Sequence, residues 1–346
     1  MIKILQGNCI DKIKELEDNS IDCVVSSPPY FGLRDYGVDG QFGLEKTYQD
    51  YLTNTVKVFE AFKPKLKDTA TIWWNVGDSY SSGLRKSTTN QSLRGSKDYG
   101  VTRTPIQNGI KEKDLLMIPN RVAIALQDAG WYIRSEIIWH KPNPMPESTK
   151  DRPTSCHEKI WLITKSKKYY YDADAIKEPT KHPNANKNKR NVWTVTTKPF
   201  KKAHFATFPK DLIKPCIKAG CPVKVCIKCG VPYKRNTNRN TNSLKVDNST
   251  LDRYGNGEAG VHRKIGGQYQ KWLNENPLIT IGWKKQCDCQ TEKTKNGIVL
   301  DPFSGAGTTG IVAKSLNRKS ILIELNPQYI EIAQKRIEEE FGLFND

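Results

Sequence analysis

The stretch that decides the fold is IVLDPFSGAGTTG, residues 298–310, in which a short apolar run passes directly into a glycine-rich loop. The apolar run predicts a buried β-strand, and the residues from Thr308 onward predict a helix. Gly305, Gly307 and Gly310 match the pattern GxGxxG, which lets backbone approach a ligand and lets strand and helix pack closely. The stretch therefore predicts one strand–loop–helix unit of an α/β sheet.

Glu324 favours a ligand-binding interpretation of this loop. Residues 320–325 predict the next β-strand, and Glu324 lies near its end. A carboxylate in that position can accept hydrogen bonds from both hydroxyls of a ribose. A lone GxGxxG pattern also occurs in ordinary tight turns, so the acid is what favours a nucleoside-binding site.

A second loop, near the N-terminus, is made rigid by proline. The apolar run Ile21 to Val25 predicts a buried strand, and it stops at Ser27-Pro28-Pro29-Tyr30. Two consecutive prolines cannot continue the hydrogen-bond ladder of a sheet, so the loop follows the carboxyl end of the strand. The Ser27 side-chain oxygen and the Pro28 carbonyl then become two acceptors held in fixed directions, which is the preorganisation that catalysis requires.

Strand and helix patterns alternate along most of the chain. Strands are expected at residues 2–6, 21–25, 70–76, 131–139, 158–164, 297–300 and 320–325, and helices at 11–16, 48–62, 114–129, 308–316 and from Pro327. Such alternation predicts an α/β protein with a doubly wound, mostly parallel sheet. Residues 79–113 are polar and basic and are expected to form a loop.

The two loops together resemble those of the amino-methylating DNA methyltransferases of the β class, in which the catalytic motif precedes the cofactor motif. The resemblance extends from Ile2 to Phe341 and is weakest between Cys221 and Cys289. It implies the fold of S-adenosylmethionine-dependent methyltransferases with permuted motif order and a small zinc-ribbon-like insert. It divides the chain into a catalytic half at 1–171, a basic target-recognition segment at 172–203, a cofactor-closing segment at 204–220, a cysteine-rich insert at 221–290 and a cofactor-binding half at 291–346.

The same resemblance implies a set of cofactor-binding residues for S-adenosyl-L-methionine. The glycine loop would surround the methionine part, Glu324 would hold the ribose, and the segment before Pro209 would close over the methionine. Asn8 replaces the acid that the family commonly has before the catalytic motif, so packing and turn formation are alternative roles there. The full expected set is Asn8, Cys9, Thr207, Pro209, Asp301, Phe303, Ser304, Gly305, Gly307, Thr308, Glu324 and Asn326.

The expected catalytic residues are Ser27, Pro28, Pro29 and Tyr30. An exocyclic amine is a poor nucleophile because its lone pair is delocalised, and two acceptors aimed at its N–H bonds would pull the nitrogen toward tetrahedral geometry. Tyr30 would stack on a base flipped out of the duplex, and Trp139 would form a second wall of the base pocket or simply pack in the core. The surplus proton would leave after methyl transfer.

The first residue of the catalytic loop favours one base. In the family, Ser-Pro-Pro-Tyr is more usual in cytosine-N4 enzymes and Asp-Pro-Pro-Tyr in adenine-N6 enzymes, so a flipped cytosine in duplex DNA is the expected substrate and adenine-N6 methylation the alternative. A Pro-Cys pair, which marks the cytosine-C5 enzymes, occurs at Pro215-Cys216. It falls in a helix-like stretch, so Cys216 is interpreted as structural.

Four of the nine cysteines form two close pairs. These are Cys226 with Cys229 and Cys287 with Cys289. Four thiolates in two pairs suit a tetrahedral structural zinc site, with reduced, unligated cysteines as the alternative. Cys221 and His262 are possible substitute ligands.

The charge balance favours a polyanionic partner. Lysine and arginine number 55 against 37 aspartates and glutamates, a formal charge of +18. Around Trp193 the residues expected to contact DNA are Lys187, Lys189, Arg190, Lys201 and Lys202, and Arg85, Lys86, Arg94 and Arg103 occur in the earlier loop. The alternative is a solvated basic surface. Double-stranded DNA is the expected partner, with a cognate restriction endonuclease as a possible second one.

Other functions remain open at this level. No apolar stretch approaches the roughly 20 residues of a membrane span, and the N-terminus lacks a signal-peptide layout, so a cytoplasmic protein of bacterial, archaeal or phage origin is expected. Rival functions are an RNA or protein-amide methyltransferase and a non-catalytic zinc DNA-binding protein. A nicotinamide oxidoreductase would leave the double-proline loop unexplained.

Overall fold

The computed structural model describes residues 1–81, 109–180, 186–197, 208–239 and 278–342. The chain forms two compact units. The first comprises residues 1–171, 190–223 and 295–346, and the second comprises 172–189 and 224–294. This division separates residues 172–189 from the rest of the expected 172–203 segment. The later segment of the second unit begins at Lys224, whereas the expected insert begins at Cys221.

The first unit is built on an eight-stranded sheet in the order β1-β14-β13-β2-β3-β5-β4-β8. The strands are β1 (Ile2–Gln6), β2 (Ile21–Ser26), β3 (Leu66–Val76), β4 (Tyr132–His140), β5 (His157–Thr164), β8 (Val192–Thr194), β13 (Ile298–Asp301) and β14 (Lys319–Glu324). Neighbouring strands run parallel from β1 to β3, and β4 runs parallel to β8. Only β5 runs antiparallel to both its neighbours among these strands, so the expected mostly parallel sheet is confirmed.

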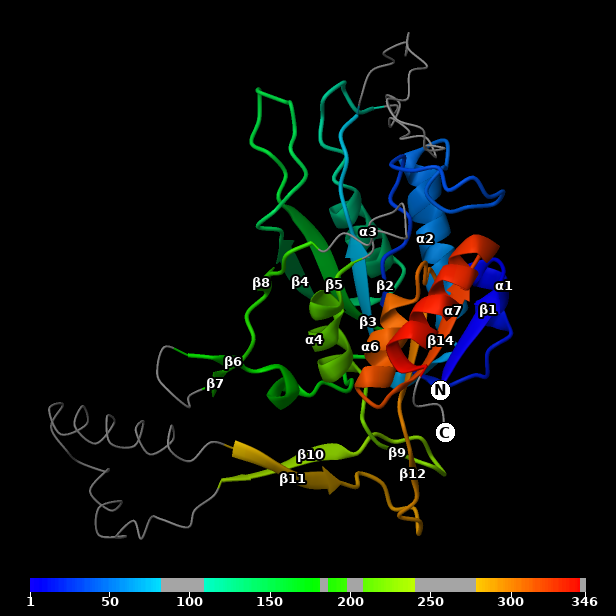
Figure 1. Ribbon diagram of the computed structural model, residues 1–346, viewed down its shortest axis with the longest axis vertical. Coiled ribbons are helices and arrows are strands. Elements are labelled where there is room, and N and C mark those ends of the chain that lie inside the picture. Colours follow the sequence, from blue (N-terminus) through cyan, green and yellow to red (C-terminus); the bar gives the residue numbers. More distant parts are fainter. Residues whose placement is uncertain (82–108, 181–185, 198–207, 240–277, 343–346) are drawn as a thin grey trace, which may run out of the picture. The chain divides into compact units, whose positions relative to one another are not determined.

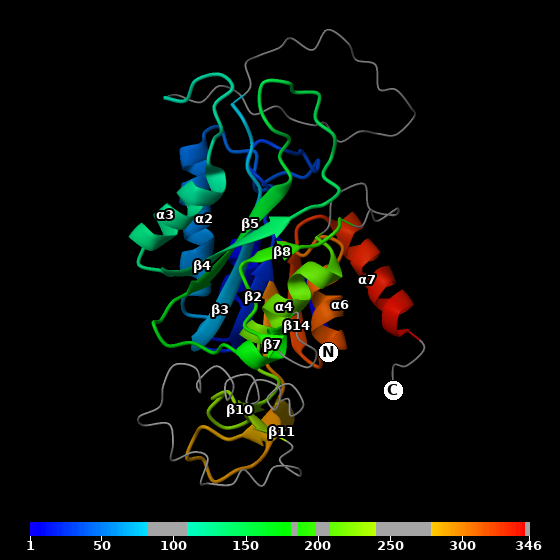
Figure 2. The same cartoon turned by 90° about the vertical axis from the view of Figure 1, so that its left-hand side faces the viewer.

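Helices cover both faces of this sheet (Figure 1), as the doubly wound prediction requires. Figure 2 shows α2 and α3 on one side and α4, α6 and α7 on the other. The helices are α1 (Cys9–Lys14), α2 (Tyr48–Phe62), α3 (Ile118–Asp128), α4 (Lys210–Gly220), α6 (Thr308–Ser315) and α7 (Pro327–Phe341). Because both faces are covered, all six residues of the central strand β2 are buried.

Aromatic side chains fill the core between the sheet and α2. Phe59 is fully buried, and its ring lies 5.1 Å from that of Trp74 and 5.3 Å from that of Trp131, both in edge-on geometry. Phe62 lies 5.4 Å from Phe59 on the same helix face. Edge-to-face packing of this kind stabilises the core beyond what the burial of the ring surfaces contributes.

Helix α3 starts later than the sequence predicts. The expected helix at 114–129 begins at Ile118, because Met117 adopts a left-handed backbone conformation with φ of 56°. Asp78, from the loop after β3, accepts a hydrogen bond from the Ile118 amide at 3.0 Å. The first turn is therefore capped by a residue distant in sequence, which no local pattern could indicate.

Strand β8 was not expected from the sequence. It lies in the segment interpreted as basic and polar, yet Trp193 is 5% exposed and pairs in register with Trp139 of β4. Its indole Nε1 donates to the Arg190 carbonyl at 2.7 Å. One large buried side chain thus fixes a three-residue edge strand, and this part of the basic segment belongs to the sheet.

The second unit contains short elements. They are the 3₁₀ helix η1 (Ala173–Ile176) and the strands β6 (Glu178–Pro179), β7 (Asn186–Lys187), β9 (Val225–Cys226), β10 (Lys234–Arg239) and β11 (Leu278–Lys284); β12 (Thr294–Lys295) lies at the unit boundary. Arg235 of β10 forms a bidentate ion pair with the buried Asp172, at 2.9 and 2.7 Å to its Oδ2. This pair joins the two sequence segments of the unit.

Across the described ranges, no helix has the length and apolarity needed to cross a membrane.

Replacing Phe59 with alanine should lower the free energy of unfolding by about 3 to 5 kcal/mol, because it leaves a cavity among closely packed rings. Urea denaturation followed by tryptophan fluorescence would measure the loss. Ile124→Ala on α3 is the matched control, since Ile124 is 58% exposed and its truncation should change stability by less than about 0.5 kcal/mol. Equal effects from the two variants would contradict this account of the core.

Candidate active site

The two loops singled out in the sequence lie at the same edge of the sheet. Strands β2 and β13 are parallel neighbours, so Ser27, which follows β2, and Phe303, which follows β13, both leave the sheet at its carboxyl edge. Strand β14 ends at this edge with Glu324. The carboxyl ends of parallel strands are where α/β proteins bind ligands.

A buried carboxylate joins the two loops. Asp301 is 1% exposed and accepts hydrogen bonds from the Ser26 hydroxyl and the Thr309 hydroxyl, both at 2.6 Å. The Phe303 amide donates to the same carboxylate at 3.1 Å. Burial raises the pKa of Asp301 to about 6. Asp301 therefore fixes the end of β2 against the start of the glycine loop, and a contact between this carboxylate and the cofactor stays a prediction.

The glycine loop has the conformation that its sequence predicts. Gly305 and Gly307 have φ of 48° and 76°, in the left-handed region that favours glycine, and Gly307 precedes the first residue of α6. The Glu324 carboxylate accepts the Gly305 amide at 2.8 Å and the Asn326 amide at 2.9 Å. Burial raises its pKa. Glu324 is thus held by backbone groups at the strand end, where the prediction places the ribose.

Several predicted cofactor residues have evident structural roles. The Asn8 side chain caps α1 by accepting the Ile10 amide at 2.9 Å, and Asn326 caps α7 by accepting the Gln328 amide. Cys9 is 8% exposed within the hydrophobic core, and burial raises its pKa to about 12. Its side chain is therefore a packing group, and a cofactor contact would have to come from its backbone.

The remaining predicted cofactor residues are mostly buried. Phe303 packs against Phe42 with ring centroids 5.3 Å apart, a partner that the sequence did not indicate. Ser304 is 7% exposed and Thr308 is 3% exposed. Pro209 is buried just before α4. Thr207 lies outside the described residues.

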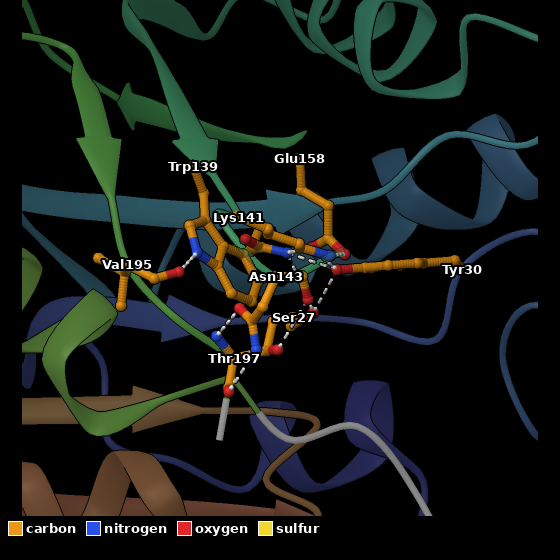
Figure 3. Close-up of polar contacts among 9 residues, drawn as sticks. Ser27, Tyr30, Trp139, Lys141, Asn143, Glu158, Val195 and Thr197 are labelled. Atoms are coloured by element: carbon orange, nitrogen blue, oxygen red, sulfur yellow. Dashed lines mark hydrogen bonds and ion pairs between the residues drawn. The ribbon is translucent and has the colours of Figure 1, made fainter. Parts of the chain in front are cut away.

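Polar contacts around the Ser27–Tyr30 loop converge on Tyr30 (Figure 3). Its hydroxyl donates to Glu158 Oε2 at 2.6 Å and accepts from the Ser27 hydroxyl at 3.2 Å. The buried Asn75 amide donates to the same Tyr30 oxygen and, at 2.8 Å, to Glu158 Oε2. Lys141 forms an ion pair with the other Glu158 oxygen. Burial first, and then the charge of Glu158, raise the pKa of Tyr30 well above its usual value.

A glycine makes room for this arrangement. A Cβ atom on Gly77 would lie 2.4 Å from the Tyr30 ring, so any larger residue after β3 would displace the ring. The Tyr51 hydroxyl donates to the Pro29 carbonyl at 3.2 Å and supports the loop from the other side. The proposed stacking of Tyr30 on a base stays a prediction.

Trp139 has a packing environment. It is 4% exposed, its Nε1 donates to the Val195 carbonyl at 2.8 Å, and the Lys141 ammonium lies 4.5 Å from its ring centroid. Nearby, Asn143 exchanges hydrogen bonds with the Thr197 backbone at 3.0 and 3.2 Å. These contacts fasten the segment after β4 to the segment after β8. The role of Trp139 as a wall of the base pocket stays a prediction.

The four paired cysteines meet in the second unit. One sulfur from each of Cys226, Cys229, Cys287 and Cys289 lies within 4.8 Å of every other. Gly230 has φ of 73° and donates its amide to the Cys226 carbonyl at 2.9 Å, which closes a tight turn around the first pair. Cys221, a possible substitute ligand, is fully buried in the first unit, and His262 lies outside the described residues.

The predicted DNA-contacting residues are only partly described. Lys187 is 42% exposed and lies 3.6 Å from Glu178. Lys189 belongs to the second unit and Arg190 to the first. Lys201, Lys202 and the four arginines and lysines at 85, 86, 94 and 103 lie outside the described residues.

Sequence reasoning missed Asn75 and Glu158. Glu158 was interpreted only as the start of an apolar strand, and Asn75 as the interior of another. Two signals were available in the sequence. Asn75 is a polar residue within an otherwise apolar strand, and Glu158 is an acid at the first position of another expected strand. The two residues form a site only because β5 runs antiparallel to β3, which places the start of β5 beside the end of β3.

Comparison with known proteins agrees with this geometry. The sequence profile of the N6/N4 DNA methylase family matches residues 21–227 and 277–335. The chain is 38% identical over 338 residues to the type II methyltransferase M.Cfr9I of Citrobacter freundii, covering 97% of this chain and 88% of that protein. The chain therefore belongs to the N6/N4 DNA methylase family, the amino DNA methyltransferases that the two loops predict.

Solved structures share the fold at low sequence identity. The PvuII cytosine-N4-specific DNA methyltransferase superposes with a TM-score of 0.57 and 15% identity, covering 99% of this chain and 91% of that one. A putative DNA modification methylase from Thermus thermophilus, in complex with S-adenosyl-L-methionine, gives a TM-score of 0.51 at 16% identity, covering 99% and 98%. These likenesses confirm the methyltransferase fold.

The raised pKa of Asp301 predicts a specific dependence of stability on pH. The unfolded carboxyl group ionises near its ordinary value of 3.8, and the folded one near 6. Between these values the folded state holds a proton that the unfolded state has released, so stability falls as the pH rises from about 4 to about 6. The shift corresponds to on the order of 3 kcal/mol.

Asp301→Asn removes this titration and serves as the reference. Urea denaturation of both proteins at pH 4, 5, 6 and 7 would measure their difference in free energy of unfolding. The free energy of unfolding of the wild type, relative to that of Asp301→Asn, should decrease between pH 4 and 6 and remain constant above pH 6. A difference that is constant, or that grows with pH, would contradict a buried protonated Asp301.

Proposed function

We propose that the protein transfers a methyl group from S-adenosyl-L-methionine to the N4 amine of a flipped cytosine in duplex DNA. The observation that carries the proposal is the position of the rigid Ser27–Pro29 loop beside the glycine loop, with Asp301 joining them. Serine at the first position favours cytosine, because that motif is the more usual one in cytosine-N4 enzymes. Adenine-N6 methylation is the second candidate, supported by membership of a family that covers both amines.

The residues at the edge of the sheet fit the methyl donor chemically. Glu324, held by two backbone amides, keeps acceptor capacity for a ribose diol, and the glycines allow close approach of backbone to the ligand. Phe303 offers an apolar surface beside them. The bound sulfonium supplies the electrophilic methyl group, so the chain has only to position and polarise the amine.

Ser27 and Pro28 act on the amine of the base. Their two oxygens accept its two N–H bonds, which localises the nitrogen lone pair and directs it out of the ring plane. The prolines keep these acceptors in place before the substrate arrives, so no reorganisation is required at the moment of reaction. Tyr30 stacks on the flipped base with its ring while its hydroxyl remains engaged with Glu158.

The cellular setting follows from the relatives. The type II methyltransferases that this chain resembles support a restriction-modification role, with a cognate endonuclease as partner and the cytoplasm as location. The excess of basic residues supports contact with DNA phosphates through the segment around residues 186–202. RNA or protein-amide substrates and a non-catalytic role lose support, because the family profile is that of a DNA methylase.

The product and the role of Ser27 can be tested together. With labelled S-adenosyl-L-methionine and mixed-sequence duplex DNA, nucleoside mass spectrometry should detect N4-methylcytosine. Ser27→Ala should reduce the single-turnover rate by about 100-fold or more, because one of the two acceptors is lost, while leaving binding of the methyl donor within about 2-fold.

Ser20→Ala is the matched control for that substitution. Ser20 precedes the opposite end of β2, and its hydroxyl donates to the Glu17 carbonyl at 2.6 Å. The single-turnover rate of Ser20→Ala should equal that of the wild type. N6-methyladenine as the product would overturn the base assignment, and undiminished turnover by the Ser27 variant would overturn the catalytic one.

We further propose that the cysteine cluster binds one structural zinc ion. In a tetrahedral site with Zn–S bonds of about 2.3 Å, the sulfurs lie about 3.8 Å apart. The four sulfurs of the second unit lie within 4.8 Å of one another, which is compatible with this separation. All four cysteines lie outside the methyltransferase unit, so the ion would stabilise the second unit and take no part in the chemistry.

Elemental analysis of the purified protein should find one zinc per chain. Cys229→Ser should release most of it and lower the thermal midpoint, because one of four ligands is lost. Cys156→Ser is the matched control, since Cys156 is a free thiol of the first unit and its loss should leave the zinc content unchanged. A metal-free protein with full stability would contradict the proposal.

A further inference from the structure

A directed chain of hydrogen bonds runs from the catalytic serine to a carboxylate. The Ser27 hydroxyl donates to the Tyr30 oxygen at 3.2 Å, and the Tyr30 hydroxyl donates to Glu158 Oε2 at 2.6 Å. Figure 3 shows these three side chains. Ser27 and Tyr30 come from the loop after β2, and Glu158 comes from β5. Tyr30 therefore accepts from Ser27 and donates to Glu158 at the same time.

The carboxylate at the end of this chain is held in place by two further side chains. Lys141 pairs with one Glu158 oxygen, and the Asn75 amide donates to the other at 2.8 Å. The side chains of Lys141 and Glu158 are 20% and 14% exposed, so most of this pair is shielded from solvent. These contacts fix the Glu158 carboxyl group with Oε2 facing the Tyr30 hydroxyl.

Tyr30 cannot be the final acceptor. Burial and the adjacent Glu158 charge keep its pKa well above the usual range, so the phenol stays protonated at neutral pH. Such a group moves a proton only by giving up its own as it receives another. Its position between Ser27 and Glu158 suits that exchange.

The methyl transfer itself creates the need for an acceptor. When the amine lone pair forms the N–C bond, the S–C bond breaks with its electron pair left on sulfur, and the nitrogen becomes cationic with one proton too many. A serine hydroxyl does not ionise near neutral pH, so Ser27 cannot keep this proton. The proton therefore needs a basic group beyond the serine.

We propose that Glu158 is the terminal acceptor of the amine proton, which reaches it through Ser27 and Tyr30. As the N–C bond forms, an N–H proton passes to Ser27 Oγ, the Ser27 proton passes to Tyr30 Oη, and the Tyr30 proton passes to Glu158 Oε2. The N–H electron pair returns to nitrogen, and Glu158 becomes a neutral carboxylic acid. Glu158 does not touch the base and acts through the other two residues.

This inference rests on the proposed role of Ser27 but not on the choice of base. Cytosine N4 and adenine N6 both have to lose one proton as the N–C bond forms, so the relay serves either product. Identification of the methylated nucleoside therefore tests the base assignment, and the rates of relay variants test the relay. The two can fail separately.

Glu158→Gln is the sharpest variant. Glutamine keeps the size of the side chain and an oxygen that accepts from Tyr30, but it cannot take up a proton. The single-turnover methylation rate should fall by about 100-fold, within the range typical of lost general-base catalysis, while the Kd values for DNA and for the methyl donor stay within about 3-fold. A purely positioning role for Glu158 would leave the rate nearly unchanged.

Tyr30→Phe tests the middle of the chain. It keeps the ring for stacking and removes the hydroxyl, so its rate should fall about as far as that of Glu158→Gln. The double variant should be no slower than either single one, because each substitution already breaks the same path. Multiplicative losses in the double variant would overturn the relay.

Glu136→Gln is the matched control. Glu136 lies on β4 and forms an ion pair with Lys159 at 2.5 Å, so the change removes a paired carboxylate from the same region of the sheet. Its rate should equal that of the wild type. Thermal midpoints of all variants should lie close together, and a loss of rate that follows a loss of folding would overturn the proposal.

A measurement on the unaltered protein keeps the proposal testable if a variant fails to fold. The single-turnover rate in mixtures of H₂O and D₂O should show a solvent isotope effect of about two, with the curvature expected when several protons move in one step. An isotope effect of about one would mean that no proton of the relay moves as the N–C bond forms, and it would overturn the inference.

Discussion

The carboxylate of Asp301 is the constraint on which the arrangement of the site depends. It is buried at the end of β13 and binds the Ser26 hydroxyl at the end of β2, the Thr309 hydroxyl in α6 and the Phe303 amide in the glycine loop. A carboxylate can accept at both oxygens at once, so a single side chain fixes two loops and a helix. The loop proposed to polarise the amine and the loop proposed to hold the methyl donor are therefore joined at one edge of the sheet.

The direction of β5 is the second constraint. An all-parallel sheet would have placed Glu158 at the edge away from the catalytic loop. Because β5 runs antiparallel between β3 and β4, its first residues lie beside the last residues of both neighbours. Asn75, Lys141 and Glu158 thereby converge on Tyr30, and Gly77 leaves space for its ring. The Glu158 carboxylate and the Lys141 ammonium thus lie next to the Ser27–Tyr30 loop, which carries no charge of its own.

Much of the first unit could be predicted from local patterns. The strand at 298–300, its glycine loop and the acid at Glu324 are adjacent in sequence, and local rules for strand, turn and helix determine them. The double proline after β2 is equally local. Predictions were wrong where a distant group decided the outcome: α3 begins at Ile118 because Asp78 caps it, and β8 exists because Trp193 is buried against β4.

The sequence by itself determined the two motif loops, the class of chemistry that they carry and the pairing of the cysteines along the chain, because each is a short pattern whose meaning is local. Only the tertiary structure decided that the sulfurs of the four paired cysteines lie close together. It alone also decided that Glu158 accepts a hydrogen bond from Tyr30. The reason is physical. Contacts between groups far apart in sequence depend on strand order and direction, which are set by the packing of the whole sheet and leave no signature at the individual residue.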